Sequence, residues 1–235
     1  MMRFASLFAL MVAFLLSGPL AHSAVQSYDQ ESAGAAGFNG NAIEIDVRNF
    51  EGLVNPNDSF LQIDPQPLVL APTVAFPATP PVSIISNGTL IVYPSGLSNS
   101  FQAAHLLSRN FGNLNELSVM LTGTGATALG FVYGTSESAF VGMTFTASVI
   151  GSAGLSSPLA QFSLNLPVAE NTPKFVGFTS DSQITGVVFS ATDVSHFNLL
   201  QVSVGTAALV PEPSQYFLFG VGLALLAAVG RRKAA

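Results

Sequence analysis

The chain has 235 residues, no cysteine and only 9% charged residues, with a mean hydropathy of +0.51. The lack of cysteine excludes disulfides and thiolate metal sites. Between residues 24 and 209 there are three basic and twelve acidic residues, a formal charge of −9. Such a surface repels phosphate backbones, so nucleic acid is excluded as a partner.

The first 23 residues have the organisation of a secretory signal peptide. A short positive start is followed by an apolar core over residues 4–16. The small residues that a signal peptidase reads then follow at Ala21, Ser23 and Ala24. We expect a signal-peptide helix that signal peptidase removes. The alternative is an uncleaved N-terminal anchor, for which the apolar core is short.

The next two segments differ in character. Residues 24–41 are rich in small side chains, and we expect a flexible mature N-terminus there. Residues 43–48 alternate strictly between apolar and charged side chains. This alternation predicts a half-buried antiparallel strand, with its apolar face on the core and its charged face in solvent.

Proline and an Asn-Gly pair dominate the following stretch. Six prolines lie between residues 65 and 81, and they predict extended loop with short edge strands, because proline lacks the amide donor of a sheet ladder. Asn87 and Gly88 separate two apolar runs, 83–86 and 89–93. Asn-Gly favours a type I′ turn, so we expect these two runs to form a hairpin.

The remainder of the body is a series of short apolar runs separated by Gly, Ser, Thr and Pro. Residues 101–107 fit a helical turn or a strand equally well. The clearer runs are 114–121, 126–133, 141–149, 159–166, 174–179, 184–190 and 197–204. Short strands at this spacing predict an all-β antiparallel sandwich or barrel.

The last 26 residues combine three features in order. The proline-framed segment comes first, then an apolar run over residues 216–230, then a basic end; the residues concerned are Pro211, Glu212, Pro213, Arg231, Arg232 and Lys233. As a helix the run is about 22 Å long against a hydrocarbon core of about 30 Å. We expect a single transmembrane helix with its basic end cytoplasmic, so that the body faces the periplasm.

This tail resembles the sorting signal of PEP-CTERM proteins. The resemblance implies that an exosortase-type enzyme processes the chain near Pro211, Glu212 and Pro213, after transient insertion in the inner membrane. It also implies a final location at the outer surface or in the extracellular matrix, in association with exopolysaccharide or biofilm. The alternative is a permanent C-terminal anchor that is never cut.

A second resemblance concerns residues 174–190, which contain Phe175, Gly177, Phe178 and Asp181 in a phrase similar to "F-x-G-F-T-S-D-x-x-I". That phrase precedes the final strand pair of a lectin-like β-sandwich ectodomain in the same family. It implies a jelly-roll-type sandwich here. The Asp-Asn-Phe sequence of that domain appears only as residues 195–198, so no ligand role is carried over.

No catalytic constellation stands out in the body. None of the common nucleophile, zinc-protease or nucleotide-binding motifs occurs. Asp193 and His196 could be imagined in a serine triad, but a turn aspartate and a strand-edge histidine are favoured. Asp58 and Asp64 could hold Ca²⁺ through oxygen ligands, although ordinary turn chemistry is favoured. We therefore expect no catalytic residue, metal or cofactor.

Four segments follow from these patterns: a signal peptide (1–23), a flexible N-terminus (24–41), a β-sandwich ectodomain (42–209) and a sorting signal (210–235). The chain is interpreted as an exported, non-enzymatic surface or matrix protein. The alternatives are a carbohydrate-binding module, a permanently anchored periplasmic protein and a cryptic hydrolase.

Overall fold

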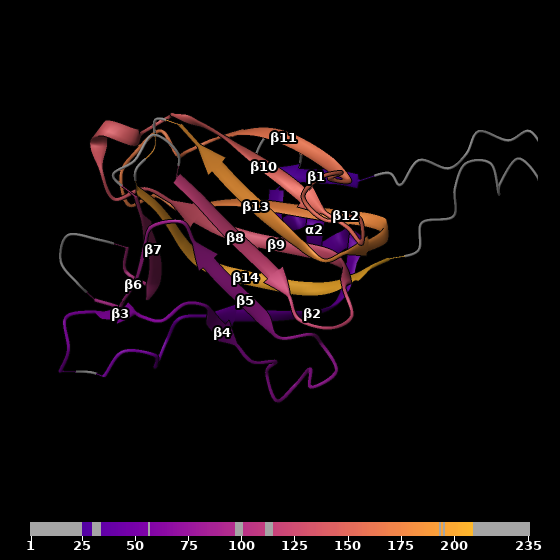
Figure 1. The fold of residues 1–235 in the computed structure, drawn as a ribbon, viewed down its shortest axis with the longest axis horizontal. Helices are drawn as coiled ribbons and strands as arrows, with labels where there is room; N and C mark the ends of the chain where they lie inside the picture. The colour runs from indigo at the N-terminus through magenta and orange to yellow at the C-terminus, as the bar shows by residue number, and fades with distance from the viewer. Residues whose placement is uncertain are drawn as a thin grey trace, which may run out of the picture.

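The computed structural model describes residues 25–29, 34–55, 57–96, 101–110, 115–192, 194 and 196–208. The predicted signal peptide and the predicted sorting signal lie outside these residues. Within them the chain forms two antiparallel sheets that pack face to face (Figure 1). The all-β sandwich expected from the spacing of apolar runs is confirmed.

The first sheet has the order β1-β12-β9-β14-β7-β6-β3, and β2 also pairs with β14. These strands are β1 (Val25–Asp29), β2 (Ala42–Asn49), β3 (Leu61–Ile63), β6 (Thr89–Tyr93), β7 (His105–Arg109), β9 (Ala126–Gly134), β12 (Lys174–Ile184) and β14 (His196–Ala207). The second sheet has the order β11-β10-β13-β8-β5-β4. Its strands are β4 (Leu68–Leu70), β5 (Val82–Ser86), β8 (Asn115–Leu121), β10 (Thr144–Ile150), β11 (Ala160–Asn165) and β13 (Gly186–Ala191).

The topology of β7 to β14 is that of a jelly roll. In space these eight strands follow the orders β7-β14-β9-β12 and β8-β13-β10-β11. These orders are those of two Greek keys wrapped into a double sheet, which is how jelly rolls limit their exposed edges. The predicted jelly-roll type is confirmed by this strand order. The seven predicted runs from residue 114 onward coincide with β8 to β14, and the undecided segment 101–107 leads into β7.

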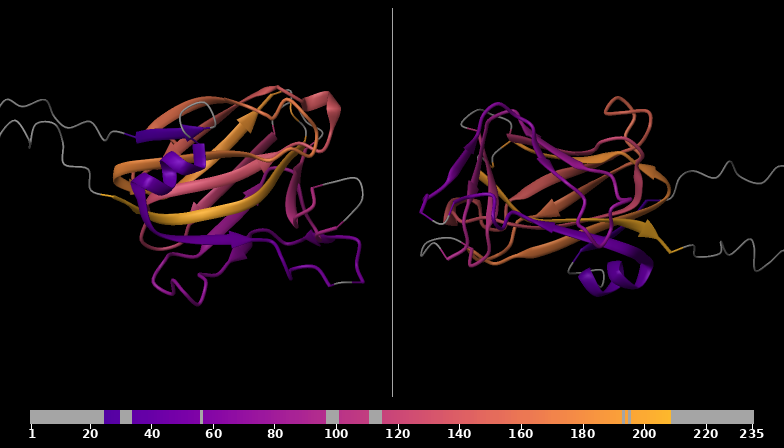
Figure 2. Two further views of the ribbon diagram at one scale, coloured as in Figure 1. Left: turned by 180° about the vertical axis from the view of Figure 1, so that it is seen from behind. Right: turned by 90° about the horizontal axis from the view of Figure 1, so that it is seen from below.

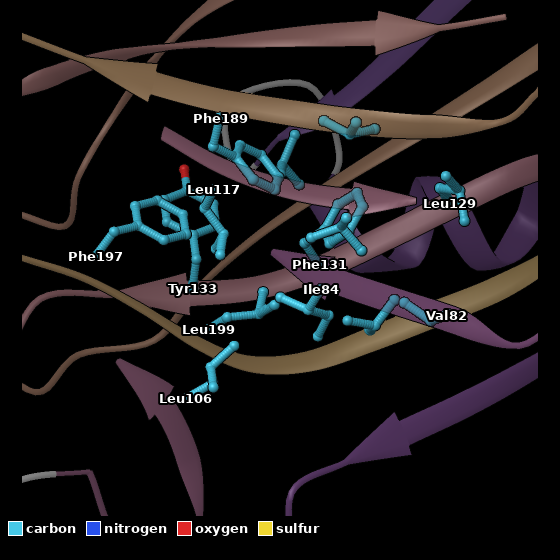
Figure 3. Close-up of a cluster of buried hydrophobic side chains, with 14 of the residues drawn as sticks. Val82, Ile84, Leu106, Leu117, Leu129, Phe131, Tyr133, Phe189, Phe197 and Leu199 are labelled. Carbon is cyan, nitrogen blue, oxygen red and sulfur yellow. The ribbon is translucent and has the colours of Figure 1, made fainter. Parts of the chain in front are cut away.

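An aromatic-rich core fills the space between the two sheets (Figure 3). Tyr133 and Phe197 stack with ring centroids 5.8 Å apart, and Phe145 meets both rings edge-on. Phe189 and Phe197 stack at 5.3 Å across the two sheets. Burial of such rings is the main stabilising contribution to a sandwich of this size. The interpretation of the body's phenylalanines as core residues holds for these positions.

Two regular elements lie within the segment 24–41, for which the sequence predicts flexibility. Strand β1 extends the first sheet beside β12, and helix α2 (Gly34–Asn41) covers the outer face of that sheet (Figure 2). Phe38 is fully buried against Gly177 and Gly130: a Cβ atom at Gly177 would collide with its ring, and one at Gly130 would crowd it. Two glycines in neighbouring strands thus leave the space into which Phe38 of the helix packs.

The predicted hairpin at Asn87 and Gly88 is wrong. Strand β5 belongs to the second sheet and β6 to the first, so the pair is a crossing between sheets. The Asn87 side chain accepts a hydrogen bond from the Glu116 amide at 3.0 Å. Gly88 is needed for a different reason, because a Cβ there would collide with the Arg109 carbonyl. Neither residue adopts the positive φ that a type I′ turn requires.

Strand β2 reverses the predicted orientation. Its charged residues Asp46 and Arg48 face the sandwich interior with 0% and 3% exposure, whereas Val47 lies on the outer face. A bulge opposite Gly205, with Glu44 at a φ of +53°, precedes the reversed stretch. Ile45 is partly buried on the outer face, where it packs against the apolar cluster around Phe38 of helix α2.

Candidate functional site: the tail attachment and its clamped loop

The sandwich is complete where the predicted sorting signal begins. Strand β14 runs through the middle of the first sheet and pairs with β9, β7 and β2. Its last pair joins Ala207 to Ala42, and the Ala208 amide donates to the Asn41 carbonyl at 2.8 Å. The last described residue, Ala208, is therefore still hydrogen-bonded to the sandwich.

The structure does not test the predicted site residues themselves. Those of the signal-peptidase site and of the sorting signal lie outside the described residues: Ala21, Ser23, Ala24, Pro211, Glu212, Pro213, Arg231, Arg232 and Lys233. The predicted helix 216–230 lies there too. In the part of the chain that the structure does describe, no helix has the length and apolar character needed to cross a bilayer.

A buried ion pair lies near this end of the sandwich, and sequence patterns did not reveal it. The Arg48 guanidinium donates to Asp46 Oδ2 through Nε at 2.9 Å and through Nη2 at 2.7 Å. Its Nη1 atom donates to the Leu70 carbonyl at 3.1 Å. Because Leu70 ends β4, the pair links the edges of the two sheets. Every such partner reduces the cost of burying the charges.

The same ion pair holds residues 71–81, which we name the clamped loop. Thr73 and Thr79 both donate their hydroxyl protons to the Asp46 carboxylate, and Thr79 also accepts from Arg48 at 2.8 Å. Burial alone would raise the pKa of Asp46, but the hydrogen bonds from Thr73, Thr79 and Arg48 lower it. An ionised, buried carboxylate that accepts from Arg48, Thr73 and Thr79 fastens the loop to strand β2.

An open hollow of about 310 Å³ lies between the clamped loop and the end of β14. Its walls include Glu44, Phe76, Thr124 and Thr206. The hollow thus places the clamped loop, the turn 122–125 and the tail attachment side by side. A carboxylate, two hydroxyls and one aromatic ring give it a mixed polar and apolar surface.

The second charged cluster lies at the opposite end, around His196 on β14. Its Nε2 atom is 3.2 Å from Glu137 Oε1, and its ring stacks on Phe140 of the short 3-10 helix Ser138–Phe140. Burial lowers the pKa of His196; Arg109 lowers it further and Glu137 opposes the shift. The carboxylate in contact is therefore Glu137, whereas Asp193 of the imagined triad lies outside the described residues.

His105, the second described histidine, and Asp58, the candidate calcium ligand, behave as packing and turn residues. His105 is buried, stacks on Tyr93 at 5.3 Å, and has its pKa lowered by burial. Asp58 accepts from the Asn55 side chain at 3.2 Å and donates its amide to the Asn55 carbonyl, which is turn chemistry. Within the described ranges no three His, Asp or Glu residues gather as metal ligands would.

Solved structures resemble this chain only weakly. They include a bacteriophage CBA120 tailspike protein 4 domain, with 14% identity and a TM-score of 0.28 over 54% of this chain and 18% of that one. A glycoside hydrolase family 43 arabinoxylan arabinofuranohydrolase from Bacillus subtilis has 15% identity and a TM-score of 0.28 over 49% and 23%. CsCBM6-3 from Clostridium stercorarium, solved with cellobiose, has 13% identity and a TM-score of 0.24 over 66% and 92%.

The chain spans less than a quarter of the length of the first two proteins, and similarities this weak carry no argument about its activity. No curated protein matches the chain.

One comparison concerns the tail alone. Residues 209–233 match the family model of the PEP-CTERM protein-sorting motif. The match begins one residue after the last described residue of the sandwich and includes the proline-framed glutamate and the basic end. The chain therefore carries a PEP-CTERM protein-sorting motif, the signal of an exported protein sorted by an exosortase.

Proposed function

We propose that the chain is a non-enzymatic surface or matrix protein. Its jelly-roll sandwich is the mature domain, and its tail is the sorting signal. Signal peptidase removes residues 1–23 during export. The apolar run 216–230 then holds the chain in the inner membrane with the sandwich in the periplasm. An exosortase-type enzyme cuts near Pro211, Glu212 and Pro213, and the product reaches the outer surface, where it associates with exopolysaccharide.

The observation that carries this proposal is the junction between sandwich and motif. The last described hydrogen bond of the sheet is made by Ala208, and the sorting motif starts at residue 209. Cleavage near residue 212 would leave all strands of the described sandwich intact. The sequence also disfavours helical conformation at Glu212, which precedes Pro213, and an extended segment suits entry into an enzyme cleft.

The buried polar groups support a role without catalysis. Asp46 and Arg48 are engaged by each other and by the clamped loop. His196 is packed against Phe140 and paired with Glu137. Both clusters stabilise loops against the sandwich, which is what a durable structural module needs.

Intact-mass analysis of the mature protein from its native host tests the proposal. We expect a chain that lacks residues 1–23 and the run 216–230. Glu212→Gln should slow C-terminal processing, whereas the matched control Glu170→Gln, an exposed acid in a sandwich loop, should be processed normally. A mature chain that still carries Tyr216 to Ala235 would show a permanent anchor instead.

The hollow beside Glu44 favours a second candidate, a carbohydrate-binding module. Hydroxyl and carboxylate groups beside an aromatic ring are groups that bind neutral sugars, and its volume of about 310 Å³ lies at the lower end of ligand pockets. Pull-down of the processed protein on host polysaccharide tests this candidate. Binding that is lost in Thr206→Trp, which would fill the hollow, supports it; binding that survives this change places the sugar elsewhere.

A further inference from the structure

Three loops lie at the end of the sandwich where strand β14 ends, and none of their residues is charged. They are the clamped loop 71–81, the turn 122–125 and the loop 151–159, which we name together the tail-side loops. Thr122 donates to the Pro81 carbonyl at 2.9 Å, and Thr185 donates to the carbonyls of Ile150 and Gly151. Hydrogen bonds between neighbouring strand ends thus join the loops into one surface.

The tips of two of these loops are apolar and exposed. Val74 in the clamped loop is 99% exposed, and Leu155 in the loop 151–159 is 59% exposed. The clamped loop cannot easily fold this apolar surface away, because Thr73 and Thr79 fasten it to buried Asp46. The lack of charge and the protruding apolar side chains make these loops a candidate contact surface.

The opposite end of the sandwich has a different chemistry. Its loops and strand ends carry Arg109, Glu116, Glu137, Glu170 and Lys174. Among the described residues on the tail side, the exposed charges are Glu44, on a wall of the hollow, and Asp181, in the bulge of β12. Both lie outside the three loops.

The length of the tail between the sandwich and its apolar run indicates what this surface contacts. Eight residue steps separate Ala208 from Tyr216, where the apolar run begins, so the sandwich is held within roughly 28 Å of the bilayer. A tether this short gives an effective concentration on the order of millimolar at the lipid surface. Even a weak apolar contact is then occupied for much of the time.

We propose that the tail-side loops rest on the lipid headgroup region of the membrane while the chain is anchored by its tail. The inference rests on the proposed anchoring of residues 216–230. Val74 and Leu155 enter the interface, where apolar side chains are favoured and charged ones are costly. This contact would fix the direction in which the segment 209–215 is presented to a membrane-embedded processing enzyme.

The absence of cysteine from the chain allows a clean test with single labels. We would place a fluorophore at Val74→Cys, Leu155→Cys or Val168→Cys in the full chain, at one copy per nanodisc of phosphatidylethanolamine and phosphatidylglycerol. Val168 is the matched control, because it is an exposed valine at 88% in a loop at the far end. Lipids that carry a quencher in the headgroup region report contact.

We expect labels at positions 74 and 155 to be quenched about three times more strongly than the label at 168, since an interfacial contact brings them within about 10 Å of the headgroups. Adding Val74→Glu to the Leu155→Cys chain should reduce its quenching towards the level at 168. Equal quenching at all three positions, in chains that co-float with the discs, overturns the lipid contact but leaves the anchor standing. Chains that do not co-float overturn the anchoring and, with it, this inference.

Discussion

The two charged clusters of the sandwich pair a carboxylate with a cationic or titratable side chain, yet they stabilise the fold in different ways. Asp46 and Arg48 are both buried, and two threonine hydroxyls complete their hydrogen bonds. In the other cluster Glu137 remains 45% exposed at the side chain, while His196 is buried beside Phe140. The first cluster is a closed network, and the second opens to solvent on one side.

This difference sets the pH range in which each cluster matters. The pKa of Asp46 is lowered, so its contribution is present above about pH 3.9 and is lost as pH falls through the lower folded-state pKa. The pKa of His196 is also lowered, so protonation favours the unfolded chain and stability falls as pH drops below about 6.5. The closed network thus resists mild acid, and the open one responds to it.

Breaking the closed network should have the largest effect. Asp46→Ala leaves Arg48 buried without its carboxylate, and we expect a loss of about 3–5 kcal/mol in the free energy of unfolding. Denaturant unfolding of the mature sandwich measures this loss. The double change Asp46→Leu with Arg48→Met removes both charges and should cost clearly less. A double variant as unstable as the single one would show that shape, rather than unpaired charge, dominates.

Removing one hydroxyl from the network should have an intermediate effect. Thr79→Val deletes a hydrogen bond to Asp46 within the clamped loop, and we expect a cost of about 1–3 kcal/mol. The exposed Thr124→Val, in the neighbouring turn, is the control and should stay within about 0.5 kcal/mol of the parent. Hydrogen exchange should show faster exchange over residues 71–81 in the first variant only.

The open cluster predicts a pH dependence of moderate size. Stability of the parent sandwich should fall between pH 7 and pH 5, and His196→Gln should weaken this dependence. Part of the slope should remain, because burial lowers the pKa of His105 as well. Chemical denaturation at several pH values tests the prediction, and a parent whose stability is flat over this range would contradict it.

The smallest effect should come from the exposed partner of His196. Glu137→Gln removes the half-exposed carboxylate beside His196. Because the pKa of His196 is lowered, the imidazole is neutral at pH 7, and we expect a change of less than about 1 kcal/mol there. Because the Glu137 charge raises the pKa of His196, the variant should titrate at lower pH than the parent. Histidine NMR signals followed across pH measure this shift, and a shift in the opposite direction would refute the assigned electrostatics.

Individual residues show why sequence patterns succeeded in some places and failed in others. The strands β8 to β14 were predictable, because each carries its own short apolar run and its own flanking turn residues. Asn87 and Gly88 are a strong local hairpin signal, yet the amide of Glu116 and the carbonyl of Arg109 determine their geometry. Residues distant in sequence outweighed a local preference.

The sequence by itself determined the sandwich class and the sorting motif, because both depend on local patterns. These are short apolar runs separated by turn residues in the body, and proline, apolar and basic residues in order at the tail. Only the tertiary structure decided which face of β2 points inward. Helix α2 supplies apolar cover outside, at Ile45, and the clamped loop supplies hydroxyl groups inside, at Asp46. Burial of a charged face becomes favourable once distant segments complete its hydrogen bonds, and no local pattern records that.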